Sequence, residues 1–226
     1  MHFLRNIFCC SLFLVFAACQ PSSHLVSPMP HADMKLVEIN KIDRSIKIDL
    51  RYQHADNIAK KPLYHPDFPA LLRPSTAKRL QVANRQLKKN DLCLVIWDAY
   101  RPQEAQLALW DASGHDDRFV ANPERHPSLH SHGCAVDVTL MHLDGRMAAV
   151  PTGFDNFSPR AASDHVHTDP LVCENMRLLK AAMWQAGFGT LPQEWWHFMD
   201  KDYRALPLIP TTELPAPLQQ MIHLYR

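Results

Sequence analysis

The alternation of apolar and polar positions predicts helices and strands within one mixed domain. Apolar residues at helical spacing indicate a helix capped by Ser75 and running to about Lys89, where Asn90 stops it. The unbroken apolar run Leu92–Trp97 has the length of a strand that is buried on both faces. A buried strand that follows an amphipathic helix is typical of a layered helix-and-sheet domain.

The second half of the chain shows the same mixture. We expect a helix from Pro102 to about Ala112, a strand over Cys134–Leu140 with Ala135 and Asp137 on one face, a turn at Asp144-Gly145, and an extended segment over Trp195–Met199. The clearest helix starts at Asp169-Pro170 and ends at Gly187, with inward positions at Leu171, Val172, Met176, Leu179, Met183 and Ala186. Helices and strands do not alternate regularly. The expected class is therefore α+β, as a single compact domain with a central, mostly antiparallel sheet flanked by helices.

Length and charge limit what such a domain does. The chain has 226 residues, enough for one domain with a hydrophobic core and too few for two comfortable ones. Its formal net charge is +1, and no basic stripe is interleaved with aromatic residues. We therefore expect no nucleic-acid partner.

The N-terminus has the features of an export signal. A positive charge at Arg5 precedes an apolar run, residues 7–16, that is too short to span a bilayer. The run closes with Phe16-Ala-Ala-Cys19, which resembles a bacterial lipobox. Residues 1–18 are therefore predicted to be a lipoprotein-type signal peptide, with Cys19 lipidated after cleavage. Phe16 stands where leucine is usual, and simple cleavage after position 18 is the alternative.

Export places the mature protein in the cell envelope. Gln20 follows the cysteine where an aspartate would be the usual inner-membrane retention signal. We therefore expect a periplasmic protein anchored to the outer membrane, if the host has one. Residues 19–34 are rich in proline, serine and histidine and are interpreted as a flexible tether, which leaves residues 35–226 as the folded domain. The domain's three cysteines allow at most one internal disulfide.

Two short segments about sixty residues apart carry the groups of a metal site. Zinc binds imidazole nitrogen and carboxylate oxygen at about 2.0–2.2 Å, and a catalytic site keeps one position for water. His130, Asp137 and His197 would supply three ligands to one Zn²⁺ per chain, in a cleft on the sheet, and Glu194 a general base. Glu194 and His197 would face opposite sides of a flat strand, so a bulge or tight bend is required between them. Thiolate ligation by Cys134 is an alternative.

Four segments, in order, resemble the D-alanyl-D-alanine dipeptidases, a zinc peptidase family that includes the vancomycin-resistance dipeptidases. The segments are Asp49-Leu-Arg-Tyr52…Asp56-Asn57, Trp97-Asp98-Ala-Tyr100-Arg101-Pro102, Ser128-x-His130-x-x-Gly133-x-Ala135-x-Asp137 and Glu194-Trp-Trp-His197. A fifth, Gly153-Phe154-Asp155, sits where the family has a similar Phe-Asp pair. The match spans roughly residues 36–204. The double tryptophan is characteristic of the dipeptidases, whereas related carboxypeptidases usually have one.

The resemblance implies a role for each matching residue. His130, Asp137 and His197 would be zinc ligands and Glu194 the general base. Arg101 would stabilise the oxyanion at the scissile carbonyl, with an ion pair to Asp98 as the alternative reading. The resemblance further implies three substrate-binding residues: Asp155 and Tyr52 for the free ammonium group, and Ser128 for the free carboxylate. The segment before Asp155 reads Val-Pro-Thr-Gly, whereas the family usually has Met-Gly-Thr.

These expectations lead to one function and two alternatives. The first is a zinc D,D-dipeptidase, with residues 35–226 as its catalytic domain, that hydrolyses D-alanyl-D-alanine or related dipeptides from peptidoglycan turnover. One alternative is a D,D-carboxypeptidase that trims stem peptides, whose site must admit a longer chain. The other is a peptidoglycan-binding lipoprotein that has lost catalysis. The presence of Glu194 argues against the last, since a binding protein needs no general base.

Overall fold

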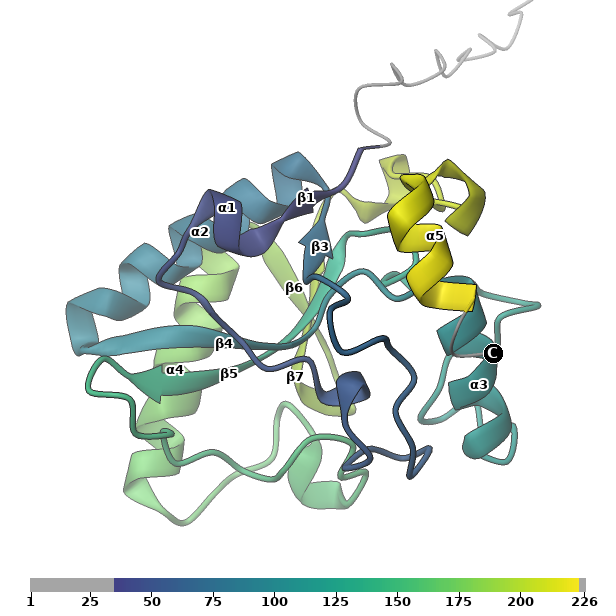
Figure 1. Ribbon diagram of the computed structural model, residues 1–226. Coiled ribbons are helices and arrows are strands. Elements are labelled where there is room, and N and C mark those ends of the chain that lie inside the picture. Colours follow the sequence, from purple (N-terminus) through teal and green to yellow (C-terminus); the bar gives the residue numbers. More distant parts are fainter. Residues whose placement is uncertain (1–34, 224–226) are drawn as a thin grey trace, which may run out of the picture.

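A five-stranded sheet runs through the centre of the protein (Figure 1). The computed structural model describes residues 35–223. The strand order is β2-β4-β5-β7-β6, namely β2 (Lys47–Ile48), β4 (Leu92–Asp98), β5 (Ala135–His142), β7 (Glu194–Asp200) and β6 (Phe188–Leu191). Only β2 is parallel to its neighbour, and the other pairs are antiparallel. A separate two-stranded sheet joins β1 (Val37–Glu38) to β3 (Leu71–Leu72).

Five α-helices surround the sheet. They are α1 (Ile39–Ile42), α2 (Pro74–Leu87), α3 (Gln103–Ala112), α4 (Pro170–Gln185) and α5 (Ala216–His223). Helices α2 and α4 pack against each other and against β4 and β6 respectively, whereas α3 lies on the far side of the molecule (Figure 1). The predicted α+β class, with a mostly antiparallel sheet, is confirmed. Among the helices within residues 35–223, none has the length and apolarity needed to cross a bilayer.

The N-terminal predictions lie outside the described residues. These are the signal peptide over residues 1–18, lipidation of Cys19 and the tether over residues 19–34. They therefore stay predictions. The three cysteines of the domain are free thiols in the structure, so the single disulfide that the count allowed is not formed.

Strand β4 forms the centre of the core. All seven of its residues are buried, because α2 covers one face and the segments around the site cover the other. The continuous apolar run Leu92–Trp97 is thus explained by burial on both faces. Strand β5 is buried over its first six residues and pairs with β4 on one side and β7 on the other.

Helix α2 starts and stops differently from the prediction. It begins at Pro74, with Arg73 rather than Ser75 at the N-cap position and no side-chain cap. Proline fits the first helical position because its fixed φ is helical and it has no N–H to satisfy. At the other end a 3₁₀ turn over Lys88–Asn90 follows, and Asp91, with φ +55°, ends it. Asn90 therefore is not the stop residue.

Helix α4 matches the predicted boundaries, with one error on its surface. The Asp169 carboxylate accepts a bond from the backbone N–H of Leu171 at 2.8 Å and so caps the helix. Val172, Met176, Leu179 and Met183 are buried as expected. Leu171 was predicted to face inward and is 68% exposed. It is rotated by about 100° from Val172 and therefore lies off the buried stripe.

Other elements were shifted or missed. Pro102 precedes α3 rather than joining its first turn, and β5 starts at Ala135 rather than Cys134. The turn at Asp144-Gly145 is confirmed by φ +93° at Gly145. Strands β1, β2 and β3 have two residues each, too few for any periodicity to be detected. These short strands nevertheless place the segments that surround the site.

Two irregularities in the sheet flank the same end of β5. In β4 the register shifts between Ile96 and Asp98, so that Asp98 lies opposite Asp137. A second shift separates β6 and β7. Thr190 pairs with Phe198, whereas the next residue, Leu191, pairs with Glu194, so the irregularity lies between Glu194 and Phe198 of β7. The predicted break between Glu194 and His197 is therefore confirmed. Bulges of this kind redirect side chains and are frequent beside active sites.

Candidate metal centre and active site

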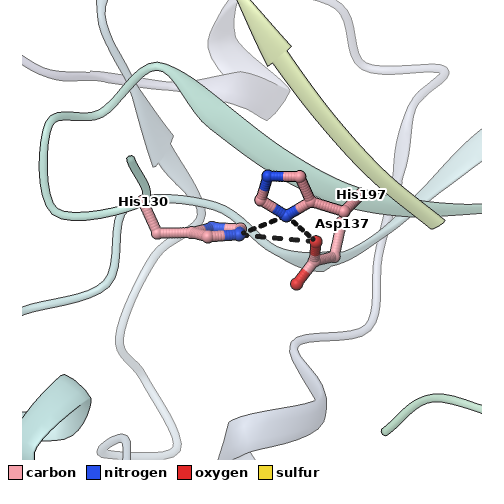
Figure 2. A group of neighbouring side chains, drawn as sticks. All are labelled: His130, Asp137 and His197. Carbon is pink, nitrogen blue, oxygen red and sulfur yellow. Dashed lines mark hydrogen bonds and ion pairs between the residues drawn. The ribbon is translucent and has the colours of Figure 1, made fainter. Parts of the chain in front are cut away.

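Three side chains converge at the irregular end of β5 (Figure 2). His197 Nδ1 lies 3.0 Å from Asp137 Oδ1 and 3.2 Å from His130 Nε2, and His130 Nε2 lies 3.4 Å from Asp137 Oδ1. Asp137 and His197 are register partners on β5 and β7, and His130 belongs to the turn that leads into β5. Within residues 35–223 this is the one group of three or more potential metal ligands that lie this close together.

The triangle of ligand atoms fits a zinc ion. Ligands at about 2.0–2.1 Å in tetrahedral directions are separated by about 3.3 Å, which is close to the three observed separations. His130 Nδ1 lies 2.7 Å from the carbonyl oxygen of Ala99, which only accepts. The proton is therefore on Nδ1, and the lone pair of His130 Nε2 points at the other two ligand atoms.

The charges suit a cation as well. All three ligand residues are buried. Burial by itself raises the pKa of the Asp137 carboxyl, but His130 and His197 beside it lower that pKa by more. The net effect is a pKa well below the usual range, so Asp137 is a carboxylate and can act as a ligand at neutral pH.

Gly133 explains how the His130 turn closes. Its N–H donates to His130 O at 2.9 Å, and its φ is +66°, which L side chains rarely adopt. A Cβ at this position would also come within 2.7 Å of Leu36 Cδ2. Glycine is therefore required both by the backbone and by the close approach of Leu36.

Cys134 is not a ligand, although it lies between two of them in sequence. Its thiol donates to Leu129 O at 3.5 Å and is not part of the ligand group. Burial raises its pKa to about 12, so the thiolate form that binds metals is strongly disfavoured. The alternative of thiolate ligation is therefore wrong for this structure.

Glu194 lies beside the ligands without joining them. Its Oε2 is 3.9 Å from His197 Nδ1, and it lines the same cavity. Burial raises the pKa of Glu194 to about 7, with the opposing effect of His197 outweighed. A carboxylate with a pKa near neutrality can both take and return a proton, which is the property of a general base that later acts as an acid.

Arg101 forms the ion pair with Asp98 and also lines the cavity. Its Nε and Nη2 lie 2.9 and 2.7 Å from Asp98 Oδ2, so the alternative ion pair is present. Its Nη2 is also 3.7 Å from Asp137 Oδ2, and the residue lines the cavity. The guanidinium is thus held by Asp98 at the wall of the cavity, next to a metal ligand.

Asp155 and Tyr52 form the polar wall of the cavity. The Tyr52 hydroxyl donates to Asp155 Oδ1 at 3.3 Å, and the Ile58 N–H donates to Oδ2 at 2.9 Å. Burial raises the pKa of Asp155 to about 6 despite these bonds. Asp155 also has φ +53°, which is uncommon for a residue other than glycine. A buried carboxylate with a raised pKa and a left-handed backbone in a cavity is a candidate binding group for a cation.

Ser128 completes the predicted set. It is buried, lines the cavity, and its Oγ accepts a bond from His130 N at 3.3 Å. That bond leaves the hydroxyl hydrogen able to donate to a ligand. All eight predicted site residues of the domain therefore line one cavity. Seven further residues line the same cavity. Of these only Trp196 belongs to a motif found in the sequence, and the full set is Ile58, Phe119, Val120, Ala121, Phe157, Leu191 and Trp196.

Asp98 was predicted only as a possible ion-pair partner of Arg101, and the structure gives it further contacts in the site. It is fully buried, and besides Arg101 it receives a bond from the Tyr64 hydroxyl at 2.8 Å and lies 3.4 Å from His130 Nδ1. It therefore holds the cavity arginine and lies beside His130, one of the three residues that could bind a metal. Its place in the segment Trp97-Asp98-Ala-Tyr100-Arg101 was the available signal. Three ligands around one point, with a carboxylate beside them and a cavity in front, define the site of a metal-dependent hydrolase.

Sequence comparisons identify the family. A family model described as D-ala-D-ala dipeptidase matches residues 32–209. A D-alanyl-D-alanine dipeptidase of Escherichia coli (strain K12) is 36% identical over 176 residues, which cover 77% of this chain and 89% of the relative. A D-alanyl-D-alanine dipeptidase of Enterococcus faecalis is 26% identical over 185 residues, 73% of this chain and 92% of the relative. The chain belongs to the D-alanyl-D-alanine dipeptidase family.

Solved structures give a weaker likeness. VanYB in complex with D-alanine-D-alanine aligns with a TM-score of 0.41 and 17% identity, over 62% of this chain and 76% of that chain. The vancomycin resistance D,D-dipeptidase VanXYg, in complex with a D-Ala-D-Ala phosphinate analog, aligns with a TM-score of 0.38 and 18% identity, over 84% and 74% of the two chains. The family assignment rests on the sequence relatives.

Proposed function

We propose that this protein is a zinc-dependent hydrolase of D-alanyl-D-alanine, or of related D,D-dipeptides from peptidoglycan turnover, which it converts to free amino acids. The observation that carries the proposal is the triangle of His130, Asp137 and His197 with Glu194 in the same cavity. The relatives named above are D-alanyl-D-alanine dipeptidases, which supports the substrate.

The protein's own residues supply the proton transfers. His130, Asp137 and His197 would hold a zinc ion, which would supply a Lewis acid to the reaction. Glu194 takes one proton from the attacking water as its oxygen bonds to the carbonyl carbon. When the carbon–nitrogen bond breaks, Glu194 returns that proton to the leaving nitrogen. Its pKa of about 7 suits both transfers.

Arg101 stabilises the negative charge that develops on the carbonyl oxygen. Asp98 binds one side of the guanidinium, so the side chain has little freedom to reorient. A charge that is already in place costs no reorganisation when the carbonyl oxygen becomes anionic. We assign Arg101 this role because it lines the cavity and its Nη2 lies 3.7 Å from Asp137 Oδ2.

Recognition of both charged ends limits the length of the substrate. Asp155, with the Tyr52 hydroxyl, pairs with the free ammonium group, and Ser128 donates to the free carboxylate. A longer peptide has an amide where the dipeptide has an ammonium group, and it would leave the buried Asp155 without a cationic partner. This is the physical difference between a dipeptidase and a carboxypeptidase.

The test is hydrolysis of three substrates by a protein that lacks residues 1–20. D-Ala-D-Ala, L-Ala-L-Ala and a pentapeptide ending in D-Ala-D-Ala would be compared with zinc and with a chelator, with Glu194→Ala as the control. We expect zinc-dependent cleavage of the D,D-dipeptide alone, abolished in the variant. Cleavage of the pentapeptide would move the assignment to a carboxypeptidase. No turnover by a folded, zinc-loaded protein would sink both enzymatic functions and leave peptidoglycan binding.

We further propose that the enzyme acts in the cell envelope. The support is the sequence Phe16-Ala-Ala-Cys19 after an apolar run, with Gln20 next to it. A periplasmic lipoprotein on the outer membrane cannot reach the cytoplasmic pool of wall precursors. Scavenging of dipeptides released during wall turnover follows as its role, rather than antibiotic resistance.

Lipidation has its own test. The full-length protein would be expressed in a bacterium with an outer membrane and labelled with a radioactive or clickable fatty acid. We expect label on the wild type and its recovery with outer-membrane fractions, and neither for Cys19→Ser. Recovery of unlabelled wild type in the soluble periplasm would instead support plain cleavage after Ala18.

A further inference from the structure

Gln106 connects the cavity arginine to the cavity wall. It lies on α3 and is 2% exposed. Its Oε1 accepts a hydrogen bond from Arg101 Nη1 at 2.8 Å, and its Nε2 donates to Ala121 O at 2.8 Å. The orientation of the amide is unambiguous, because a guanidinium only donates and a carbonyl only accepts.

The other contacts of Arg101 show why a second support matters. Asp98 binds through a single oxygen, Oδ2, to both Nε and Nη2. Asp137 Oδ2 lies on the same Nη2 side at 3.7 Å. Two carboxylates therefore attract one part of the guanidinium, and Gln106 binds the remaining nitrogen, Nη1. A neutral amide fixes this nitrogen without adding a further negative charge.

The second bond of Gln106 reaches the cavity itself. Ala121 lines the cavity together with Phe119 and Val120, which belong to the irregular segment after α3. The hydrogen bond from Gln106 Nε2 to Ala121 O ties this segment to α3. The same side chain thus sets the direction of Arg101 and the position of the wall that faces it.

We propose that Gln106 is a positioning residue for hydrolysis, acting through Arg101. It touches neither the metal ligands nor the cavity surface, and its effect is to hold Arg101 Nη1 while Asp98 holds the other edge. The proposal rests on the proposed role of Arg101 in stabilising the transition state. It predicts a loss in kcat rather than in dipeptide affinity, because the charge of Arg101 remains while its alignment is lost.

The test is a double-mutant cycle on D-Ala-D-Ala hydrolysis by the zinc-loaded enzyme. Gln106→Met keeps the length and volume of the side chain and removes both bonds. We expect kcat to fall about 10-fold, as for loss of a hydrogen bond to a charged group, with KM changed less than about 2-fold. In an Arg101→Ala background the same substitution should have almost no effect, because the group through which it acts is gone.

Controls separate this role from simple packing. Gln103→Met makes the same substitution at an exposed position of α3 and should leave kcat unchanged. Gln106→Asn keeps a buried amide that is too short to reach both partners, and it should show the same coupling to Arg101. Thermal unfolding of every variant shows whether each one folds. If Gln106→Met does not fold, the double-mutant cycle is carried out with Gln106→Asn instead.

Two results would overturn the inference, and they have different consequences for the proposed role of Arg101. If Arg101→Ala lowers kcat and the effects of the two substitutions simply multiply, Gln106 does not act through Arg101, and the proposed function stands. If Arg101→Ala leaves kcat unchanged in a zinc-loaded protein, the role of Arg101 fails and that of Gln106 fails with it.

Discussion

The proposed metal ligands and the residues proposed to bind the substrate's ammonium group line one cavity, but the fold holds them in different ways. Asp137 and His197 are register partners in the middle of the sheet, where strand hydrogen bonds fix their backbones. Asp155 stands in a loop with a left-handed backbone, and Tyr52 in a short 3₁₀ turn. Two of the three proposed metal ligands thus lie on paired strands, whereas the two residues proposed to bind the ammonium group lie in connecting segments.

The charges differ in the same way. Neighbouring histidines lower the pKa of Asp137, so the fold favours its ionised form. Burial raises the pKa of Asp155 to about 6, so the fold opposes its ionised form. The metal half is therefore organised before substrate binds. Arg101 offsets only part of the effect of burial on the pKa of Asp155, and the ammonium group of the substrate would offset more.

The largest expected effect comes from removing a ligand on the strand side. In His197→Ala the zinc ion would lose one of three ligands, and activity on D-Ala-D-Ala should fall at least about 10³-fold. Zinc content by mass spectrometry and turnover rate would be measured together. His142→Ala, at the other end of β5 and outside the cavity, should retain both. Retention of zinc and activity by His197→Ala would exclude it as a ligand.

A smaller effect, of a different kind, is expected on the loop side. Asp155→Asn removes the charge that pairs with the ammonium group and keeps the size of the side chain. We expect kcat/KM to fall about 10- to 100-fold, mostly through KM, with zinc content unchanged. A loss confined to kcat would mean that Asp155 serves the chemistry rather than binding, and the contrast between the two halves would disappear.

The pKa of Asp155 makes this contrast depend on pH. Only the ionised carboxylate pairs with the ammonium group, so the advantage of wild type over Asp155→Asn in kcat/KM should be constant above about pH 7. Below about pH 6 it should shrink, by up to tenfold per pH unit. The ratio of the two profiles cancels the titration of groups common to both proteins. A ratio independent of pH between 5 and 8 would contradict the raised pKa.

The stability of the wild-type fold should change with pH in the direction opposite to substrate binding. The pKa of Asp155 is raised from 3.8 to about 6, so folding favours its protonated form. Its contribution to stability is full below pH 3.8 and is lost as pH rises through 6. At pH 7 the Asp155→Asn variant should therefore be more stable than wild type, by up to about 3 kcal/mol of unfolding free energy, and should unfold at a higher temperature. Near pH 4 the difference should vanish.

The smallest effect is expected at Ser128. Its hydroxyl would donate one bond to the substrate carboxylate, and Ser128→Ala should raise KM about 2- to 10-fold at unchanged kcat. Thermal unfolding is the control, because Ser128 Oγ also accepts from His130 N and its loss affects the ligand turn. A fall in zinc affinity would assign Ser128 to the metal half instead.

The sequence predicted the strand-borne half of the site better than its surroundings. The run Leu92–Trp97, the strand predicted over Cys134–Leu140 and the break between Glu194 and His197 all follow from periodicity and chemistry. The structure confirms them, with the second strand observed over Ala135–His142. The resemblance also named Tyr52, Arg101, Ser128 and Asp155, which the structure places in one cavity. Their functional roles stay predictions until variants are measured.

The remainder of the cavity was not predictable because it depends on tertiary packing. Phe119, Val120 and Ala121 lie in an irregular segment with no periodic pattern, and tertiary contacts such as the bond from Gln106 to Ala121 O hold this segment at the cavity. The position of Asp98 opposite Asp137 depends on a register shift, which sequence periodicity does not reveal. The same limit explains the two-residue strands, whose existence is decided by their partners.

Gly133 and Leu36 set a limit on trimming the chain. The turn that carries His130 leaves no room for a side chain at position 133, because Leu36 occupies that space. Leu36 immediately precedes β1, at the start of the described domain. A protease cut or a deletion that removed Leu36 would open a gap beneath the His130 turn. We therefore expect the minimal active domain to begin no later than Leu36, although the His130 turn that Leu36 packs against lies nearly a hundred residues further along.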